Sequence, residues 1–439
     1  MIYFLIIYFL IFSFIAWRNL PSAFAILIVL LPAYLVRFYI WAFPTTLLEG
    51  MIVVIIGTWF IQTGFKQVVK RHRKEIPYQK FPFQNQIILI MLASIISVLI
   101  APDFYKALGL WRAYFLEPIL LFLIFIQTIN NKKDFKKILY ALGISALAIS
   151  IFAIYQKITG KFIPEPMWRP EEVRRVTSFY TSPNAVGLFL APITMVYLGW
   201  LKEGTNIFST LWKITILSLS LLTIFFTVSE GTWIGLLGAS LFFLFFYVNQ
   251  KIQNKTYIKK IKITLATLIL AIVILSPFYF NFIQEKFNQI IENKSAQNRL
   301  ILWQGSGDFL TQNYKNFIFG AGIFGFPKVQ DNFRDPLKLE AHIYPHNIFL
   351  NFWLDLGLLG AIAFMWLIFS FLKKSYQLIK KYKSPLVIGL TSSMITILVH
   401  GLIDVPYFKN DLAILFWVII SLLIIKELLL KKEKLLTKS

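Results

Sequence analysis

The residues in this sequence most suited to chemistry are a histidine and an asparagine at the start of a long apolar run. The stretch YPHNIFLNFWLDLGLLG, residues 344–360, contains His346 and Asn347, then nine residues, then Gly357 and Gly360. An imidazole has an ordinary pKa of about 6.5, so His346 suits a general base at neutral pH. The chain has four histidines and no cysteine, which excludes thiolate chemistry and disfavours a dedicated histidine metal cluster.

A purely structural interpretation of the same stretch also exists. Asn347 suits the first position of a helix, where its side chain would satisfy open main-chain amides. Gly357 and Gly360 suit close packing of membrane helices. His342, four residues before His346, is placed to assist it.

Three arginines are candidates for binding an anion. Arg299 stands 47 residues before His346, and Arg174 and Arg175 are adjacent in an earlier polar stretch. A guanidinium is always charged and offers a planar fork to phosphate. The alternatives are an interfacial position for Arg299, with its charge extended toward water, and ordinary solvated loop charge for Arg174 and Arg175.

Composition indicates what must position these residues. The chain has 439 residues, of which 57% are hydrophobic and 15% charged, whereas soluble domains carry about a quarter charged residues. Long apolar runs recur, and a membrane-spanning backbone satisfies itself as helices. The sequence therefore predicts an all-α polytopic integral membrane protein. The net charge of +23 would suggest nucleic acid in a soluble protein, but here it fits loops that set topology, so no nucleic-acid partner is expected.

We predict about 12–13 transmembrane helices and one large outer loop. The candidate spans lie near 1–17, 22–41, 48–65, 84–101, 113–129, 138–157, 184–201, 213–228, 232–249, 263–282, 347–372, 385–405 and 411–428. The first is interpreted as a retained span, without a cleavage site. Short basic loops belong in the cytoplasm, whereas long loops escape that rule. The basic tail is therefore expected in the cytoplasm, and the segments 157–183 and 283–345 outside.

Three regions follow from this division. Residues 1–150 are N-terminal spans, residues 151–410 contain the candidate site with outer loops 158–183 and 283–345, and residues 411–439 form the last span and tail. Within 283–345, apolar residues in NRLILWQGSGDFL recur at three-to-four spacing and predict a helix. A transporter would place polar groups near the bilayer midplane, and the predicted spans carry almost no charge at that depth.

The His-Asn, nine-residue, Gly-x-x-Gly pattern resembles the hallmark of the O-antigen ligase and polymerase family of membrane glycosyltransferases. Three other stretches are similar to family segments: the Arg-x-x-x-Trp in NRLILWQGSGDFL, GAGIFGF at 320–326, and RRVTSFYTSPNAVG. HGLIDVPYFKNDLA resembles a tail segment of many members. The likeness spans about residues 150–410.

The resemblance implies transfer of a glycan from a polyprenyl-pyrophosphate carrier to an acceptor hydroxyl at the outer face of the cytoplasmic membrane. It implies His346 as the base, Arg299, Arg175 and Arg174 as pyrophosphate ligands, inversion at the anomeric carbon, and no metal or other cofactor. The expected partners are the lipid-linked glycan donor, a lipid or glycan acceptor, and membrane lipids.

One position departs from the family pattern. The family usually has Ser-Arg at the outer start of a middle span, and this chain reads TVSEGTWIG, with Glu230 in place of the arginine. A carboxylate cannot neutralise phosphate, so another cation must serve, or the donor is handled differently. Two other functions stay open at this point: a transporter or flippase of lipid-linked glycans, and a non-catalytic scaffold for envelope assembly.

Overall fold

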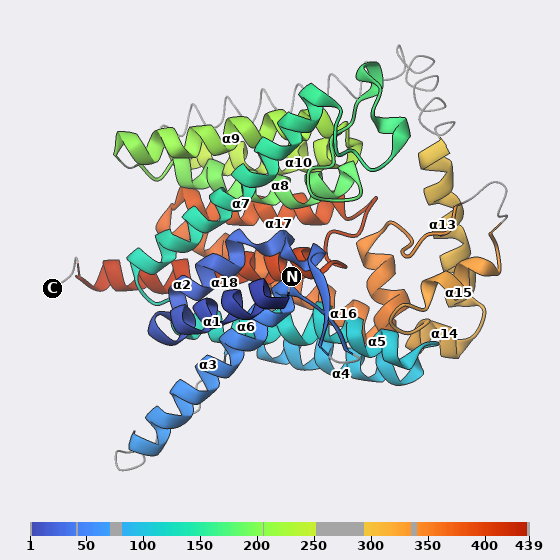
Figure 1. The fold of residues 1–439 in the computed structure, drawn as a ribbon, viewed down its shortest axis with the longest axis horizontal. Helices are drawn as coiled ribbons and strands as arrows, with labels where there is room; N and C mark the ends of the chain where they lie inside the picture. The colour runs from blue at the N-terminus through green and yellow to red at the C-terminus, as the bar shows by residue number, and fades with distance from the viewer. Residues whose placement is uncertain are drawn as a thin grey trace.

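The structure, a computed structural model, describes residues 2–40, 43–70, 81–204, 206–251, 294–334 and 340–436. Its described part is a bundle of helices with one two-stranded hairpin (Figure 1). This confirms the predicted all-α fold of a polytopic membrane protein.

The elements follow one another along the chain with short connections. The first region contains α1 (Ile2–Arg18), α2 (Leu20–Val29), η1 (Leu31–Leu35), β1 (Arg37–Ile40), β2 (Phe43–Thr46), α3 (Leu47–Lys70), α4 (Gln84–Ile100), α5 (Phe104–Trp111), η2 (Arg112–Leu116), α6 (Glu117–Thr128) and α7 (Lys132–Thr159). The second contains η3 (Pro166–Trp168), η4 (Glu171–Val173), α8 (Pro183–Leu201), α9 (Ile207–Thr227), α10 (Glu230–Lys251), α13 (Lys294–Thr311), α14 (Tyr314–Phe319), α15 (Phe326–Asp331), α16 (Ile348–Tyr382), α17 (Pro385–His400) and α18 (Asn410–Leu436).

Seven helices within the described residues are long and apolar enough to cross a membrane. They are Phe104–Thr128, Lys132–Thr159, Pro183–Leu201, Ile207–Thr227, Glu230–Gln250, Ile348–Tyr382 and Asn410–Leu436. Five shorter apolar helices accompany them, among them α4 and α17. The exact number of spans stays a prediction, because the span predicted at 263–282 lies outside the described residues.

The span predicted at 22–41 is wrong as a single helix. The α-helix α2 ends at Val29, and a 3₁₀ turn and strand β1 follow it, paired antiparallel with β2. Pro32 lies in that turn and has no N–H with which to continue an α-helix. Ten residues of α2 rise only about 15 Å, half of a bilayer core. By contrast, the helix predicted in NRLILWQGSGDFL is confirmed as α13.

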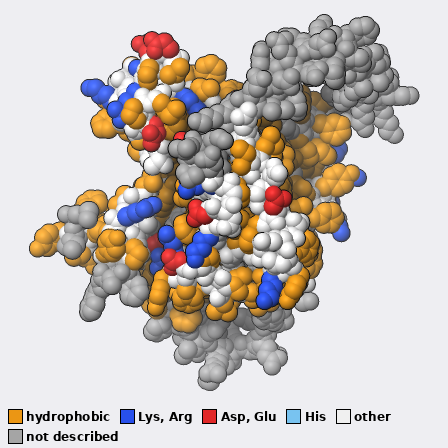
Figure 2. All heavy atoms as spheres, turned by 90° about the vertical axis from the view of Figure 1, so that its right-hand side faces the viewer, with side chains coloured by type: hydrophobic (Ala, Val, Ile, Leu, Met, Phe, Trp, Pro, Cys, Tyr) orange, Lys and Arg blue, Asp and Glu red, His pale blue; other side chains and the backbone are white. Residues whose placement is uncertain are grey.

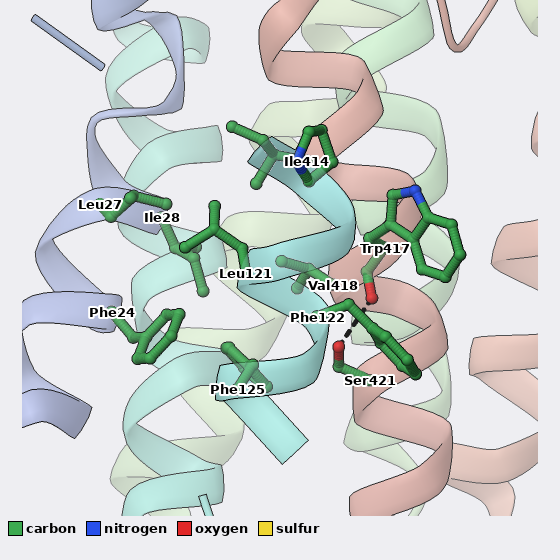
Figure 3. A pocket seen from close by; sticks show the side chains of 11 residues that line it. Phe24, Leu27, Ile28, Leu121, Phe122, Phe125, Ile414, Trp417, Val418 and Ser421 are labelled. Atoms are coloured by element: carbon green, nitrogen blue, oxygen red, sulfur yellow. Dashed lines mark hydrogen bonds between the residues drawn. The ribbon is translucent and has the colours of Figure 1, made fainter. Parts of the chain in front are cut away.

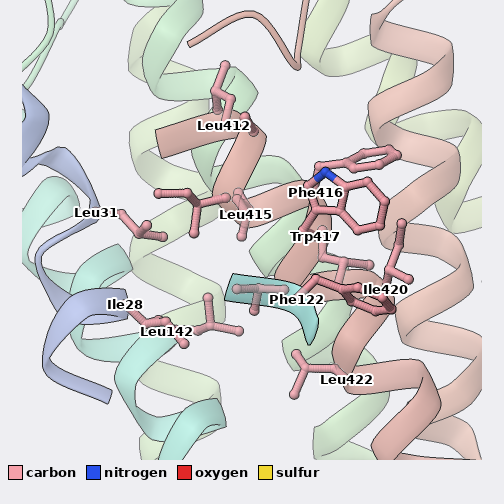
Figure 4. Close-up of a cluster of buried hydrophobic side chains, with 14 of the residues drawn as sticks. Ile28, Leu31, Phe122, Leu142, Leu412, Leu415, Phe416, Trp417, Ile420 and Leu422 are labelled. Carbon is pink, nitrogen blue, oxygen red and sulfur yellow. The ribbon is translucent and has the colours of Figure 1, made fainter. Parts of the chain in front are cut away.

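The last helix lies at the centre of the bundle. Every residue of α18 from Asp411 to Ile425 is buried. Figure 4 shows Leu412, Leu415 and Phe416 of this helix within a cluster that also includes Phe122 of α6. Beside this cluster lies a small apolar cavity of about 10 Å³, lined by side chains of α2, α6 and α18 (Figure 3). None of its lining residues is charged, so we interpret it as a small gap in the helix packing and not as a binding site.

The two long connecting segments lie at the same end of the bundle. In Figure 1 the segment between α7 and α8 and the helices α13 to α15 stand at the right, whereas the C-terminus stands at the left. That both segments lie outside the membrane stays a prediction. Figure 2 looks onto this end and shows charged side chains of both signs among hydrophobic ones.

Candidate active site

His346 lies where the segment from α15 turns into α16. Its φ of +53° places it in the left-handed region, which histidine adopts more often than most residues. Asn347 then caps the helix, because its side-chain oxygen accepts from the main-chain N–H of Phe349 and Leu350, both at 3.0 Å. The turn at His346 and the cap at Asn347 together fix where the imidazole points.

The start of α16 is fastened to the loop between α17 and α18. The N–H of Ile348 donates to the carbonyl of Gly401 at 2.7 Å, and the side-chain amide of Asn347 donates to the carbonyl of Leu402 at 3.0 Å. Asp404 follows on the same loop. These two bonds therefore bring Asp404 beside His346, 58 positions earlier in the chain.

Asp404, His346 and His342 form a continuous row. Oδ1 of Asp404 lies 3.3 Å from Nδ1 of His346, and Nε2 of His346 lies 3.2 Å from Nδ1 of His342. The side chain of Asp404 is 8% exposed and that of His346 is 27% exposed. A buried carboxylate thus faces a histidine whose ring is reachable from outside.

The carboxylate of Asp404 is held in its charged form. Burial raises its pKa, but the hydrogen bond and charge of His346, the charge of His400 and the N–H of Val405 lower it more, so the pKa lies well below its usual range. The N–H of Val405 donates to Oδ1 at 2.9 Å. An anionic Asp404 stabilises a positive charge on the imidazole beside it.

Asn184 extends the row to Arg175. Its amide nitrogen donates to Oδ2 of Asp404 at 3.4 Å, and its oxygen accepts from Nη2 of Arg175 at 3.3 Å. Nε of Arg175 donates to the carbonyl of Thr227 at 2.8 Å. The structure therefore links Arg175 to His346 through two intervening side chains.

Arg174 has different surroundings from Arg175. Its guanidinium donates to the main-chain carbonyls of Arg169 at 2.9 Å and Lys157 at 2.8 Å, and weakly to that of Ile158 at 3.4 Å. It therefore ties the end of α7 to the loop that follows. The guanidinium of Arg174 bonds only main-chain carbonyls of its own region, whereas that of Arg175 also reaches the side chain of Asn184 beside Asp404.

Arg299 lies on α13, next to the histidine pair. Its positive charge contributes to lowering the pKa of His342, and within the described part of the chain no hydrogen bond or ion pair engages its guanidinium. One helical turn later, Nε1 of Trp303 donates to the carbonyl of Pro345 at 2.9 Å. The Arg-x-x-x-Trp spacing thus anchors α13 to the residue before His346 and leaves a cation beside the site.

Glu230 begins α10 on the other side of Arg175. Its side chain is exposed. Burial lowers the pKa of Arg175, and the negative charge of Glu230 opposes that shift. A Cβ on the next residue, Gly231, would meet the ring of His400 at 2.6 Å. The position where the family usually has arginine therefore lies at this site, and here it supplies negative charge near Arg175.

The spaced glycines form the break in α16. Gly357 has φ +70° and ψ −176° within the helix, and a Cβ there would overlap the main-chain oxygen of Ile318. The break frees the carbonyl of Leu354, which accepts from the N–H of Ala321 at 2.6 Å. GAGIFGF therefore packs directly on the break. Gly360 follows about one turn later, and a Cβ there would overlap the side chain of Leu356.

An apolar groove of about 430 Å³ opens beside the site. It is lined by Trp303 and Asn347 at the site end and by Trp353, Phe364 and Met365 along α16. Met365 is 51% exposed on the outside of the bundle. The groove therefore connects the edge of the site with the surface that a bilayer would cover.

The structure brings His346, Arg299 and Arg175 to one region, and it adds two residues that sequence reasoning passed over. Asp404 and Asn184 are part of two family-like stretches, HGLIDVPYFKNDLA and RRVTSFYTSPNAVG, and neither is among the predicted site residues. Both had a signal, because each is a polar residue within a stretch that resembles the family, SPNAVG and HGLIDV. Neither segment reveals its distant partner.

Comparison with known proteins agrees with these features. The family model described as O-antigen ligase matches residues 215–365, a stretch that includes Arg299, His346, Gly357 and Gly360. No curated protein matches the chain. The matched family acts on lipid-linked glycans and their acceptors, and the long apolar helices of the chain fit a multi-pass membrane protein. This match supports the O-antigen ligase and polymerase family of glycosyl-transferring membrane enzymes for this chain.

Proposed function

We propose that this enzyme transfers a glycan from a polyprenyl-pyrophosphate carrier to an acceptor hydroxyl at the outer face of the cytoplasmic membrane. The observation that carries the proposal is the 3.3 Å contact between Asp404 and His346, next to a guanidinium of Arg299 with no described partner. A carboxylate-backed base and a nearby cation are what such a displacement requires.

The positively charged side chains stabilise the leaving group. Negative charge grows on the phosphate oxygen as the glycosidic bond breaks, and a positioned guanidinium stabilises it without a metal. Arg299 and Arg175 are the proposed ligands. Arg174 has less support, because its hydrogen bonds go only to main-chain carbonyls, whereas Arg175 is linked through Asn184 and Asp404 to His346.

The row of side chains from Asp404 to His346 removes the proton of the acceptor hydroxyl. The acceptor hydroxyl loses its proton to the histidines as its oxygen attacks the anomeric carbon. The bond between that carbon and the phosphate oxygen breaks, and polyprenyl pyrophosphate leaves with the electron pair. One displacement inverts the anomeric carbon. The resulting imidazolium is stabilised by the anionic Asp404.

The groove beside Asn347 supports a lipid substrate, because it joins the site to the bilayer-facing surface of α16. The distribution of basic residues indicates the side of the membrane on which the site lies. Two described basic stretches lie at the end opposite to α13–α15, where Lys132 pairs with Glu433 and Lys374 with Glu427 of α18 (Figure 1), and short basic loops stay in the cytoplasm. The site is then at the outer face.

The experiment uses purified protein with a polyprenyl-pyrophosphate-linked glycan and an acceptor-lipid extract. Released polyprenyl pyrophosphate is measured for the wild type, for His346→Ala, and for His72→Ala, which removes a histidine predicted to lie in a cytoplasmic loop. Release that depends on acceptor and His346, but not on His72, supports the proposal.

The other results have defined meanings. Equal release from wild type and His346→Ala would remove His346 as the base. Passage of labelled donor across liposomes without chemical change would favour a transporter, and glycan synthesis retained in cells with His346→Ala would favour a scaffold. Product size separates the two enzyme types: one addition of a preformed chain indicates a ligase, and a ladder indicates a polymerase.

A further inference from the structure

We propose that His342 is the residue that meets the acceptor hydroxyl and that it passes the proton on to His346. The inference deepens the proposed function and rests on it. It assigns a second catalytic histidine, four residues before the one that the sequence motif marks.

Both ring nitrogens of His346 are already engaged. Nδ1 faces Asp404 at 3.3 Å and Nε2 faces Nδ1 of His342 at 3.2 Å. An acceptor hydroxyl therefore has no nitrogen of His346 to approach while this row is intact. The unengaged end is Nε2 of His342, which is buried and has no hydrogen-bond partner among the described residues.

The direction of the hydrogen bonds follows from the acid at the other end. A carboxylate only accepts, so Nδ1 of His346 carries a proton, and Nε2 of the neutral ring has a lone pair. Nδ1 of His342 must then donate to it, which leaves the lone pair of His342 on Nε2. The row thus ends in a base at His342.

The proton step balances along this row. The acceptor O–H gives its proton to Nε2 of His342, and the proton on Nδ1 of His342 moves to Nε2 of His346. His342 is neutral again, in its other tautomer, and His346 is an imidazolium beside Asp404. The acceptor oxygen uses its freed electron pair to form the new glycosidic bond, as polyprenyl pyrophosphate leaves.

Neighbouring groups hold His342 in place and keep it neutral. Its main-chain N–H donates to Oε1 of Gln330 at 2.8 Å, and Gln330 is a buried residue of α15 that itself donates to the carbonyl of Glu340 at 2.9 Å. Burial lowers the pKa of His342, and the charges of His346 and Arg299 lower it further. The charge of Glu340 raises it but does not cancel the shift. A neutral ring at pH 7 is ready to accept a proton.

Two substitutions separate a relay from a positioning role. In His342→Asn, the amide nitrogen takes the place of Nδ1 and still donates to His346, but nothing remains to accept a proton. In His342→Ala, both functions are lost and space for a small base is opened. The relay predicts that both variants lose about 10²-fold or more of kcat, with donor KM within about twofold of wild type, and that added imidazole restores activity to His342→Ala. Wild-type kcat in His342→Asn would overturn the relay, because it would leave His342 a positioning role only.

A second measurement does not depend on activity. Ring ¹⁵N spectra of histidine-labelled protein contain four histidines, which single substitutions assign. The relay expects His342 to be protonated on Nδ1 alone at pH 7, and His346→Ala to change that tautomer balance. Protonation of His342 on Nε2 alone would overturn the relay whatever the enzyme transfers. A wild type that releases no polyprenyl pyrophosphate, with the expected spectrum, would instead count against the proposed function and leave the proton row standing.

Discussion

Asp404 Oδ1 and His346 Nδ1 lie 3.3 Å apart, although 58 positions separate the two residues in the chain. Main-chain and side-chain bonds from Ile348 and Asn347 to Gly401 and Leu402 fix this approach. The motif histidine is therefore supported by an acid from a different loop.

Asp404→Asn is expected to lower kcat by about 10²-fold or more while donor KM changes little. The amide keeps the shape of the side chain but cannot stabilise an imidazolium, and it can donate to Nδ1 and so favour the wrong tautomer. Steady-state kinetics of transfer would measure this. Asp308→Asn, an exposed change on α13, is the matched control. Equal kcat for the two variants would contradict a role for Asp404 in the proton step.

Acid is expected to destabilise the fold through His342 and Asp404. Both have a folded-state pKa below the unfolded value, which is about 6.5 for histidine and about 3.9 for aspartate. The unfolded chain therefore binds more protons, so each stabilising contribution is fully present above its unfolded pKa and is lost as pH falls. Thermal unfolding between pH 8 and pH 4 should show Tm falling below about pH 6.5. The fall should be smaller in His342→Asn, and an identical fall in both would argue against His342 as its source.

Arg175 and Arg174 are expected to give opposite results. Arg175→Ala should raise donor KM by about 10- to 100-fold, which corresponds to the binding free energy of one charged hydrogen bond. The loss of stability should be modest. Arg174→Ala should lower Tm, because three carbonyls lose their donor, with donor KM nearly unchanged. Kinetics and thermal unfolding of both variants decide this, and a larger KM effect in Arg174→Ala would reverse the assignment.

Gly357→Ala is expected to destabilise the protein by about 1–3 kcal/mol, since φ is +70° and the new methyl group would overlap the carbonyl of Ile318. Gly307→Ala is the control, because a Cβ there meets nothing within 4 Å and alanine favours a helix by up to about 1 kcal/mol. The free energies of unfolding of the two variants are measured in detergent and compared. If Gly357→Ala were as stable as Gly307→Ala, the break in α16 would not require glycine.

The sequence by itself determined the class of protein and identified the residues of the His-Asn and Gly-x-x-Gly motif. Its apolar runs require helices, because a bilayer offers no water to open main-chain groups. The helix from Lys294 was predictable from three-to-four periodicity. His346, Asn347 and the spaced glycines could be identified because their spacing lies within one short segment.

Only the tertiary structure decided what surrounds His346. Asp404 and Asn184 reach the site because α8 and the loop between α17 and α18 pack together, and the two residues are 220 positions apart. Arg174 and Arg175 are indistinguishable as neighbours in a sequence, yet the local chain path directs one to the end of α7 and the other toward Asn184. The prediction of one continuous span at 22–41 was wrong for a related reason. Apolar residues indicate burial, but Pro32 and the hairpin after it determine where the chain goes. Periodicity within one segment reports local structure, whereas contacts between distant segments depend on how all the helices pack.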